Sequence, residues 1–326
     1  MAGLRDIERK VIAGLERDAR AHFSKIGKKM RKSQQQVSYT VNSLEKQGII
    51  KGYYTIIDYS KLDVLHFRAY FKVSYISEKK MEELARSMAS EPMTCFVATC
   101  GGEYDLIATF LAKNPSQFNK ALHKIMEKHP RHLQNFTVLT TVVARGSGRK
   151  YLFSNTNTLT EDIYGGDREA EKIDELDMRL LERLSANARE SALKLAAKLG
   201  TTSKTVIERI KRMQDRLVIR SFRPLLDLQS AGYKRSLLTI RYHNITAEKE
   251  NELINFLNAH PNVLRLFKTI GEWDVEVELE GEDAQKLRKI EMEIRERFAA
   301  LIQTIRIIPL YDVHKINYFP KILEQH

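Results

Sequence analysis

The chain has 326 residues, a hydrophobic content of 43% and a formal net charge of +12 at pH 7. This length corresponds to two or three domains, and no apolar run reaches the roughly 18 residues of a membrane span. The first part of the chain, Met1 to Arg20, is charged throughout, which excludes a secretory signal peptide and predicts a cytoplasmic protein.

The positive charge lies in two segments. Through Phe153 there are 26 basic and 14 acidic residues, whereas the remainder has 28 of each. Within that remainder, Asp177 to Pro224 carries 12 basic and 5 acidic residues. A local excess of this kind indicates a polyanionic partner, whereas a role in solubility alone would explain the total but not the placement.

The first segment begins with three expected helices: Leu4 to Leu15, Phe23 to Met30, and a helix that starts at Ser33 and ends at Gly48. Val37, Val41 and Leu44 give the third helix one apolar face. Its outer face carries amide and hydroxyl groups, and basic residues precede it. The candidate DNA-binding residues of this unit are Lys28, Lys29, Lys32, Ser33, Gln34, Gln35, Ser38, Tyr39 and Asn42.

Amide and hydroxyl groups match the donors and acceptors of base edges in a major groove, and the three helices have helix-turn-helix (HTH) spacing. An ordinary polar surface helix is the alternative. The β-rich run Ile49 to Ile57 follows, and we expect it to form a wing.

A second type of unit follows, with the order strand, helix, strand, strand, helix, strand. The expected elements are His66 to Tyr75, Lys79 to Ala89, Thr94 to Thr99, Asp105 to Ala112, Pro115 to His129 and Leu133 to Ala144. This order predicts a ferredoxin-like βαββαβ domain. Cys95 and Cys100 are too few for a disulfide framework or a zinc site. We expect them to be buried or half-buried thiols on a strand, with a redox switch as the alternative, and we expect no metal or cofactor.

The whole pattern repeats at an offset of 169 residues. Asp18-Ala19-Arg20 matches Asn187-Ala188-Arg189, and Gly102-Glu103-Tyr104-Asp105 matches Gly271-Glu272-Trp273-Asp274. One offset that holds across helices, loops and strands indicates duplication of an entire unit. The expected fold is therefore α+β, with two copies of a winged HTH followed by a ferredoxin-like domain.

The expected domains are residues 1–60, 61–145, 173–228 and 229–326, with a linker at 146–172. In the second copy the candidate DNA-binding residues are Lys198, Ser203, Lys204, Thr205, Glu208, Arg209 and Arg212. Two of the differences between the copies bear on how the HTH units work. Thr40 stands where the second copy has the basic Arg209, and Leu217 replaces the helix-ending Gly48, so we expect the second wing to turn differently.

The repeated motifs resemble those of the Lrp/AsnC (feast/famine) transcriptional regulators. They include the motifs quoted above and two further ones, Leu44-Glu45-Lys46-Gln47-Gly48-Ile49-Ile50 and Thr205-Val206-Ile207-Glu208-Arg209-Ile210. The resemblance covers both halves of the chain. It implies DNA binding by the third helix of each HTH, effector domains of the RAM type that pair with each other, and association into homo-oligomers. It also implies an amino-acid effector near Gly102, Glu103, Tyr104, Asp105, Gly271, Glu272, Trp273 and Asp274, although simple hairpin turns would need the same glycines.

Two other functions remain open. Some Lrp/AsnC-like proteins resemble enzymes that decarboxylate sirohaem, and alternating His66, Arg68 and Tyr70 are the best candidates for such a pocket. A ligand sensor that no longer binds DNA is the third possibility. The basic HTH segments favour the regulator.

The two sheets are also expected to pack on each other. Leu106, Ala108 and Phe110 should face the helices, which leaves the alternate positions on an open face. The offset places Glu276, Glu278 and Glu280 on the open face of the second copy. Because like charges repel, we expect this face to meet that of the first copy, with Arg68 and Lys72 near the glutamates.

Overall fold

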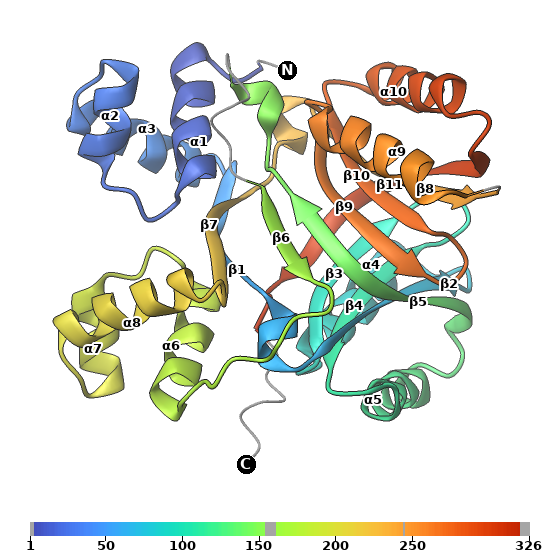
Figure 1. Cartoon of the computed structure of the whole chain (residues 1–326), viewed down its shortest axis with the longest axis horizontal. Helices are drawn as coiled ribbons and strands as arrows, with labels where there is room; N and C mark the ends of the chain where they lie inside the picture. The colour runs from blue at the N-terminus through green and yellow to red at the C-terminus, as the bar shows by residue number, and fades with distance from the viewer. Residues whose placement is uncertain (1–2, 154–160, 244, 320–326) are drawn as a thin grey trace.

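The structure, a computed structural model, describes residues 3–153, 161–243 and 245–319. Two helical units lie side by side against a barrel of strands (Figure 1). Among the residues that the structure describes, every helix is too short or too polar to cross a lipid bilayer.

The two helical units have the expected HTH elements. The first contains α1 (Asp6–Arg17), α2 (Phe23–Met30) and α3 (Gln34–Lys46), and the second contains α6 (Glu175–Ala186), α7 (Ala192–Leu199) and α8 (Ser203–Asp215). Apolar positions at helical spacing explain each core: α3 buries Val37, Val41 and Leu44, and α8 buries Val206, Ile210 and Met213.

The strands that follow α3 and α8 are not wings, because they pair with each other. β1 (Ile50–Ile57) and β7 (Ile219–Leu226) form an antiparallel two-stranded sheet in which Tyr54 lies opposite Arg223. Each strand also completes the core of the other copy's HTH. Leu226 packs with the first HTH, and Ile56 and Ile57 pack with the second. The two copies are therefore interlocked through their connecting strands.

The turn after α8 also differs from our expectation. Leu217 adopts a left-handed conformation with φ of 60°, close to the φ of 71° at Gly48. The amides of Leu217 and Val218 donate to carbonyls of α8 just as the amides of Gly48 and Ile49 donate to carbonyls of α3. The two copies turn alike, and Leu217 is held in a conformation that favours glycine.

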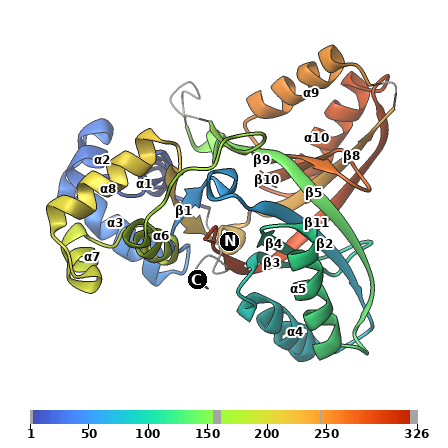
Figure 2. The same ribbon diagram turned by 60° about the horizontal axis from the view of Figure 1, so that its bottom comes forward.

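The two ferredoxin-like domains share one sheet. Their helices are α4 (Glu78–Ser90), α5 (Pro115–Lys128), α9 (Ala247–Ala259) and α10 (Ala284–Arg297). Their strands are β2 (Leu65–Val73), β3 (Thr94–Cys100), β4 (Leu106–Ala112), β5 (Leu133–Gly146), β8 (Lys234–Tyr242), β9 (Val263–Ile270), β10 (Val275–Gly281) and β11 (Ile302–Ile316). The order β2-β4-β3-β11-β8-β10-β9-β5 closes into a barrel because β2 also pairs with β5. The copies meet where β11 pairs with β3 and β5 pairs with β9 (Figure 2).

The faces predicted to be open line the interior of this barrel. Leu106, Ala108 and Phe110 pack under the helices, as expected, whereas Glu276, Glu278 and Glu280 are buried inside. The predicted proximity of Arg68 to the glutamates is confirmed, since Arg68 pairs with Glu276. The prediction for Lys72 is wrong, because Lys72 pairs with Asp105 at the end of its own domain.

The cysteines are buried on β3, as expected. Burial raises the pKa of Cys95 to about 11 and that of Cys100 to about 12. Both thiols are therefore protonated at neutral pH, which makes them poor nucleophiles and disfavours the redox-switch alternative.

The segment predicted as a linker contains regular structure. A short 3-10 helix, η2 (Lys150–Leu152), packs near the first HTH, and strand β6 (Asp162–Gly165) pairs with β5. Arg149, Lys150 and Tyr164 are buried. This structure was not predicted from the sequence, because the segment contains few apolar residues and they show no helix or strand spacing. Residues 154–160 of the predicted linker lie outside the described residues.

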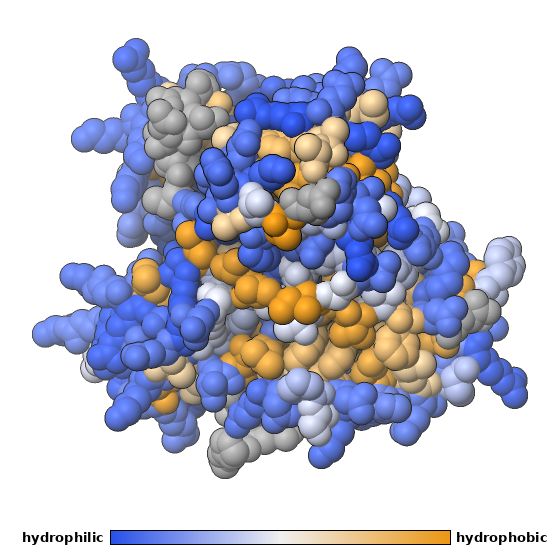
Figure 3. Space-filling model, turned by 45° about the vertical axis from the view of Figure 1, so that its right-hand side comes forward, coloured by the Kyte–Doolittle hydropathy of each residue, from blue (hydrophilic) through white to orange (hydrophobic). Residues whose placement is uncertain are grey.

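The helices cover the barrel only in part. Hydrophobic residues form a band across the face seen in Figure 3, and hydrophilic residues cover the regions above and below it. Strand residues accordingly reach the surface, and the side chains of Phe136 on β5 and Ile270 on β9 are 42% and 69% exposed. A patch of this kind is typical of association surfaces.

Candidate DNA-binding surface and effector turns

Helix α3 presents the polar face expected of a reading helix. The hydroxyl of Ser33 accepts a hydrogen bond from the Gln36 amide at 3.1 Å, and the Gln36 side chain accepts one from the Ser33 amide at 3.1 Å. This capping box fixes where the helix starts. Because the apolar face is buried, the remaining residues face solvent: Gln34, Gln35, Tyr39 and Asn42 are exposed, and Ser38 is half-buried.

Helix α8 presents a different surface. Thr202 caps it, and Lys204, Ile207 and Glu208 are exposed, whereas Ser203 and Thr205 are half-buried. The side chain of Ile207 is 58% exposed at the position that Ser38 occupies in the first copy. An apolar residue on a reading helix can contact a thymine methyl group.

Arg209 does not lie in the position expected of a phosphate ligand. It donates to Asp174 and Asp177 at the start of α6, at 2.6 and 2.9 Å, and Arg212 donates to Asp177 at 2.6 Å. These bonds lower the pKa of Asp174. The arginines clamp α8 onto α6. In the first copy the counterparts of Asp174 and Asp177 are Arg5 and Glu8, which pair with each other at the start of α1. Thr40 instead donates to its own helix, at the Gln36 carbonyl.

Basic residues flank both reading helices. Lys28, Lys29 and Lys32 are exposed at the end of α2 and in the turn before α3. Lys198 is exposed on α7, where it pairs with Glu190. Ammonium groups that are close to a helix-turn-helix and reach solvent are suited to phosphate contacts.

Two arginines that the motif analysis did not interpret hold the HTH units together. Arg20 donates to the Ala188 and Glu190 carbonyls at 2.6 and 3.0 Å, and Arg189 donates to the Ala19 and Ala21 carbonyls. The Ala19 amide donates to Phe222 on β7, and the Ala188 amide donates to Tyr53 on β1. The repeated Ala-Arg motif is thus a reciprocal clamp that places both HTH units on one side of the barrel (Figures 1 and 2).

The two candidate effector turns meet at one end of the barrel. The rings of Tyr104 and Trp273 lie 6.2 Å apart, and each also contacts Tyr70. Asp105 accepts a hydrogen bond from the Val73 amide at 2.9 Å, and Asp274 accepts one from the Tyr242 amide at 2.8 Å. Both carboxylates therefore cap neighbouring strands, which is the structural role that a hairpin turn would need.

The other residues of these turns have mixed surroundings. Glu103 pairs with Arg306 at 2.8 Å, and Arg241 donates to the Glu272 carbonyl at 2.6 Å. Gly102, at φ of 89°, has open space where a side chain would stand, whereas Gly271 lies against the Val138 carbonyl. Among the described residues, the buried indole nitrogen of Trp273 has no hydrogen-bond partner.

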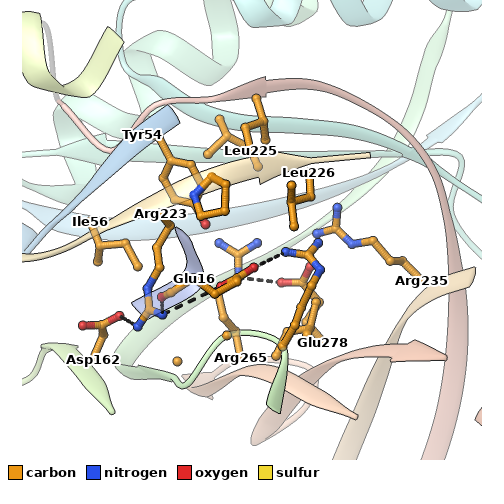
Figure 4. Close-up of a pocket in the computed structure, with 16 residues that line it drawn as sticks. Glu16, Tyr54, Ile56, Asp162, Arg223, Leu225, Leu226, Arg235, Arg265 and Glu278 are labelled. Atoms are coloured by element: carbon orange, nitrogen blue, oxygen red, sulfur yellow. Dashed lines mark hydrogen bonds and ion pairs between the residues drawn. The ribbon is translucent and has the colours of Figure 1, made fainter. Parts of the chain in front are cut away.

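The barrel interior combines ion pairs with apolar residues such as Ile107 and Leu237. Each buried glutamate has an arginine: Arg68 with Glu276, Arg265 with Glu278 at 2.6 Å, and Arg149 with Glu280 at 2.6 Å. Figure 4 shows arginines and carboxylates alternating along the junction with the first HTH, where Arg223 donates to Asp162. Two cavities in this region, among the described residues, have volumes of only about 40 and 20 Å³.

Comparison with known proteins agrees with this architecture. Residues 173–214 match the AsnC-type helix-turn-helix domain. An uncharacterised HTH-type transcriptional regulator of Pyrococcus furiosus is 30% identical over 146 residues, which are 44% of this chain and 97% of that protein. A regulator of the same description from Pyrococcus horikoshii is 29% identical over 145 residues, 44% of this chain and 96% of that protein.

One solved structure has the fold of both units together. It is the siroheme decarboxylase NirDL, in complex with an iron-uroporphyrin III analogue, with a TM-score of 0.62 and 13% sequence identity over 98% of this chain and 97% of that one. At this identity the likeness concerns the fold alone. The sequence match to nearly the entire length of a regulator, together with the AsnC-type domain, places this chain in the Lrp/AsnC family of DNA-binding transcriptional regulators.

Proposed function

We propose that the protein acts in the cytoplasm on an asymmetric operator, which it contacts with both reading helices at once. The observation that supports this is the pair of unlike exposed faces, Gln34, Gln35 and Asn42 on α3 against Lys204 and Ile207 on α8, held together by one clamp. Gln and Asn suit adenine, Lys suits guanine, and isoleucine suits a thymine methyl group.

Selection of binding sites from random DNA tests this proposal. Two unlike half-sites are expected. Asn42→Ala should relax base preference only in one half-site and Lys204→Ala only in the other, by about 1–3 kcal/mol for each lost base contact. Recovery of clean inverted repeats would contradict the proposal, as would variants that change both half-sites equally.

Phosphate contacts are expected to supply much of the affinity. If about six phosphates are neutralised, log K should fall with log salt with a slope of about −5. The double variant Lys28→Ala, Lys29→Ala should weaken all sequences equally and flatten the slope. A matched control is Lys79→Ala, Lys80→Ala on α4, which removes the same charge from exposed positions on the barrel. A slope near zero for the unaltered protein would refute DNA binding.

We also propose that a small amino acid binds where the two effector turns meet, and that it modulates DNA binding. The support is the indole N–H of Trp273, a buried donor without a protein partner in the described region, together with the open space at Gly102 in the turn that carries Tyr104. A buried unpaired donor is costly unless a ligand or water accepts from it. Because Asp105 and Asp274 already cap strands, we expect Glu103 or Glu272 to receive the ammonium group.

Thermal unfolding in the presence of each of the twenty amino acids tests this site. At least one should raise the midpoint, and Trp273→Phe, which keeps a ring but removes the donor, should abolish the shift. An unchanged midpoint with all twenty would remove the effector proposal and leave the DNA-binding proposal intact.

Finally, we propose that the protein is not a sirohaem decarboxylase. A tetrapyrrole is far larger than the two cavities around the buried charges, of about 40 and 20 Å³. The three candidate side chains already have protein partners: His66 bonds to Thr141, and Arg68 and Tyr70 bond to Glu276. Visible spectroscopy after incubation with sirohaem provides the test. A stoichiometric Soret band that survives gel filtration would contradict this proposal.

A further inference from the structure

The first copy shows how a strand edge of the barrel can be covered. β5 pairs with β2 along its first half, and beyond that point β6 takes the same edge, with Tyr164 opposite Ala144 and Gly165 opposite Val143. Tyr164 is fully buried, and its ring packs at 6.1 Å against Tyr59. β6 is thus an added strand anchored by an aromatic side chain.

A buried carboxylate anchors the other end of this segment. Asp58 is fully buried and accepts hydrogen bonds from the Gly165 amide at 2.8 Å and from Arg168 at 2.6 Å. The amide of Gly166 completes the pairing by donating to the Val142 carbonyl at 2.8 Å. The segment therefore offers an aromatic residue and, four positions later, an arginine.

The same edge is open in the second copy. β11 pairs with β8 only as far as Leu310, and no further strand among the described residues joins that edge at Tyr311 to Val313. The offset of 169 makes Tyr311 and Val313 the counterparts of Val142 and Ala144. An uncovered edge with free backbone groups is a template for an incoming strand.

A groove of about 290 Å³ lies beside this edge. It is lined by Leu226, Leu228, Asp227, Arg235 and Val313, among others. Asp227 is the counterpart of Asp58, and it accepts a hydrogen bond from the Gln229 amide at 3.2 Å, as Asp58 does from the Ser60 amide. Its side chain is nevertheless 42% exposed, and the cation paired with it is Lys51, at 3.6 Å. The groove therefore repeats the apolar wall and the carboxylate that hold β6.

One side chain substitutes for the missing strand. Gln229 donates from its side-chain amide to the Tyr311 carbonyl, the counterpart of the carbonyl that accepts from Gly166 in the first copy. An incoming backbone amide would replace this bond with an equivalent one. The Tyr311 carbonyl therefore keeps a hydrogen bond when an incoming strand displaces the Gln229 side chain.

We propose that the β11 edge is a docking site for an extended segment of a partner protein, which adds as a strand at Tyr311 to Val313. The segment carries an aromatic residue that enters the groove beside Leu226 and Leu228, and an arginine four positions later that pairs with Asp227. Main-chain hydrogen bonds supply affinity in this mode of recognition, and side-chain pockets supply specificity. The site lies apart from the reading helices and does not depend on the proposed operator.

A labelled peptide with the sequence of residues 161–169 serves as the probe, because it contains Tyr164 of β6 and Arg168, which follows that strand. Fluorescence anisotropy with the full chain should show saturable binding. Alanine in place of the peptide tyrosine, or Asp227→Asn in the protein, should weaken binding at least about tenfold, as expected for an anchor residue or a charged hydrogen bond. Gln229→Ala should tighten binding by roughly two- to tenfold, because it removes the competing amide.

Asp58→Asn is the matched control, since it alters the anchor of β6 and should leave peptide affinity unchanged. The proposal is overturned if no saturable binding appears at about millimolar concentrations, or if Asp58→Asn rather than Asp227→Asn abolishes binding, which would mean exchange with β6. Self-association of the chain that Asp227→Asn abolishes would assign the edge to a second copy and also overturn a foreign partner.

Discussion

At the scale of single residues, buried charge distinguishes the barrel interior from an ordinary core. Arg68 and Glu276 are almost fully buried, and Nε of Arg68 lies 3.1 Å from the carboxylate. Tyr70 donates to the same carboxylate. A pair of this kind gives little net stability compared with apolar residues, but removal of one partner leaves the other charge buried and unpaired.

Arg68→Met is therefore expected to lower the free energy of unfolding by about 3–5 kcal/mol. Arg68→Met with Glu276→Leu should cost much less than the sum of the two single changes, because neither charge then remains alone. Urea unfolding measures both. Lys72→Met on the same strand is the control: Lys72 is 43% exposed, and its loss should change stability by no more than about 1 kcal/mol.

Lys150 provides a pH dependence. Burial lowers the pKa of this amine from 10.5 to about 8. The amine donates hydrogen bonds to the Asn258 and His260 carbonyls. Between pH 8 and 10.5 the unfolded chain holds one more proton here than the folded chain, so stability contributed by this group rises with pH in that window. The unfolding free energy of the wild type, relative to Lys150→Met, should increase from pH 8 to pH 10. A constant difference would contradict the assignment.

At the scale of elements, the helices were predictable because their information is local. Ser33 and Thr202 cap α3 and α8, and apolar residues recur at helical spacing, so each start and each buried face could be read without a partner. The strands β1 and β7 were found but misinterpreted. An isolated β-rich run has the same pattern whether it folds into a hairpin wing or pairs with a distant strand.

The turn after α8 leads to the next prediction. Leu217 is 49% exposed and sits at φ of 60°, a conformation that costs an L-residue roughly 1–2 kcal/mol. Leu217→Gly should therefore stabilise the fold by about 0.5–1 kcal/mol, since the greater freedom of glycine in the unfolded chain offsets part of the gain. The reverse change at the matched position, Gly48→Leu, should destabilise it. Urea midpoints that move in the opposite directions would contradict this account of the turn.

The candidate sites were less predictable than the fold. Exposed residues of α3 were identified because they lack an apolar role, whereas the use of Arg209 as a clamp required knowledge that Asp174 and Asp177 fold next to it. The arginines that pair with Glu278 and Glu280 were missed for the same reason, since Arg149, Arg235 and Arg265 come from three separate segments. Pairing partners are a property of the tertiary structure.

At the scale of the whole molecule, one chain contains the interface that two identical chains would otherwise form. The antiparallel β1–β7 pair is centred on Tyr54 and Arg223, which occupy equivalent positions in the two copies. A duplicated gene can change each half separately, so positions at the centre can differ. Here Arg223 contacts Glu16 and Asp162, whereas Tyr54 packs near Tyr318. The duplication could be read from the sequence, but this asymmetry at the centre needed the structure.

The clamp between the HTH units carries the last prediction. Arg20 and Arg189 each donate to two carbonyls of the opposite unit, so together they fix the separation of the reading helices. DNA half-sites must match that separation, because a half-turn insertion of about 5 base pairs rotates one half-site to the other face of the duplex. The intact protein should lose at least about tenfold in affinity for such a DNA. Arg20→Gln with Arg189→Gln should bind the original site more weakly and lose much less affinity on insertion, since the two units can then reorient.

Arg86→Gln on α4, which removes an exposed arginine from the barrel, is the control and should behave like the wild type. Equal sensitivity to spacing in the clamp variant and the wild type would mean that the β1–β7 strands alone position the two units.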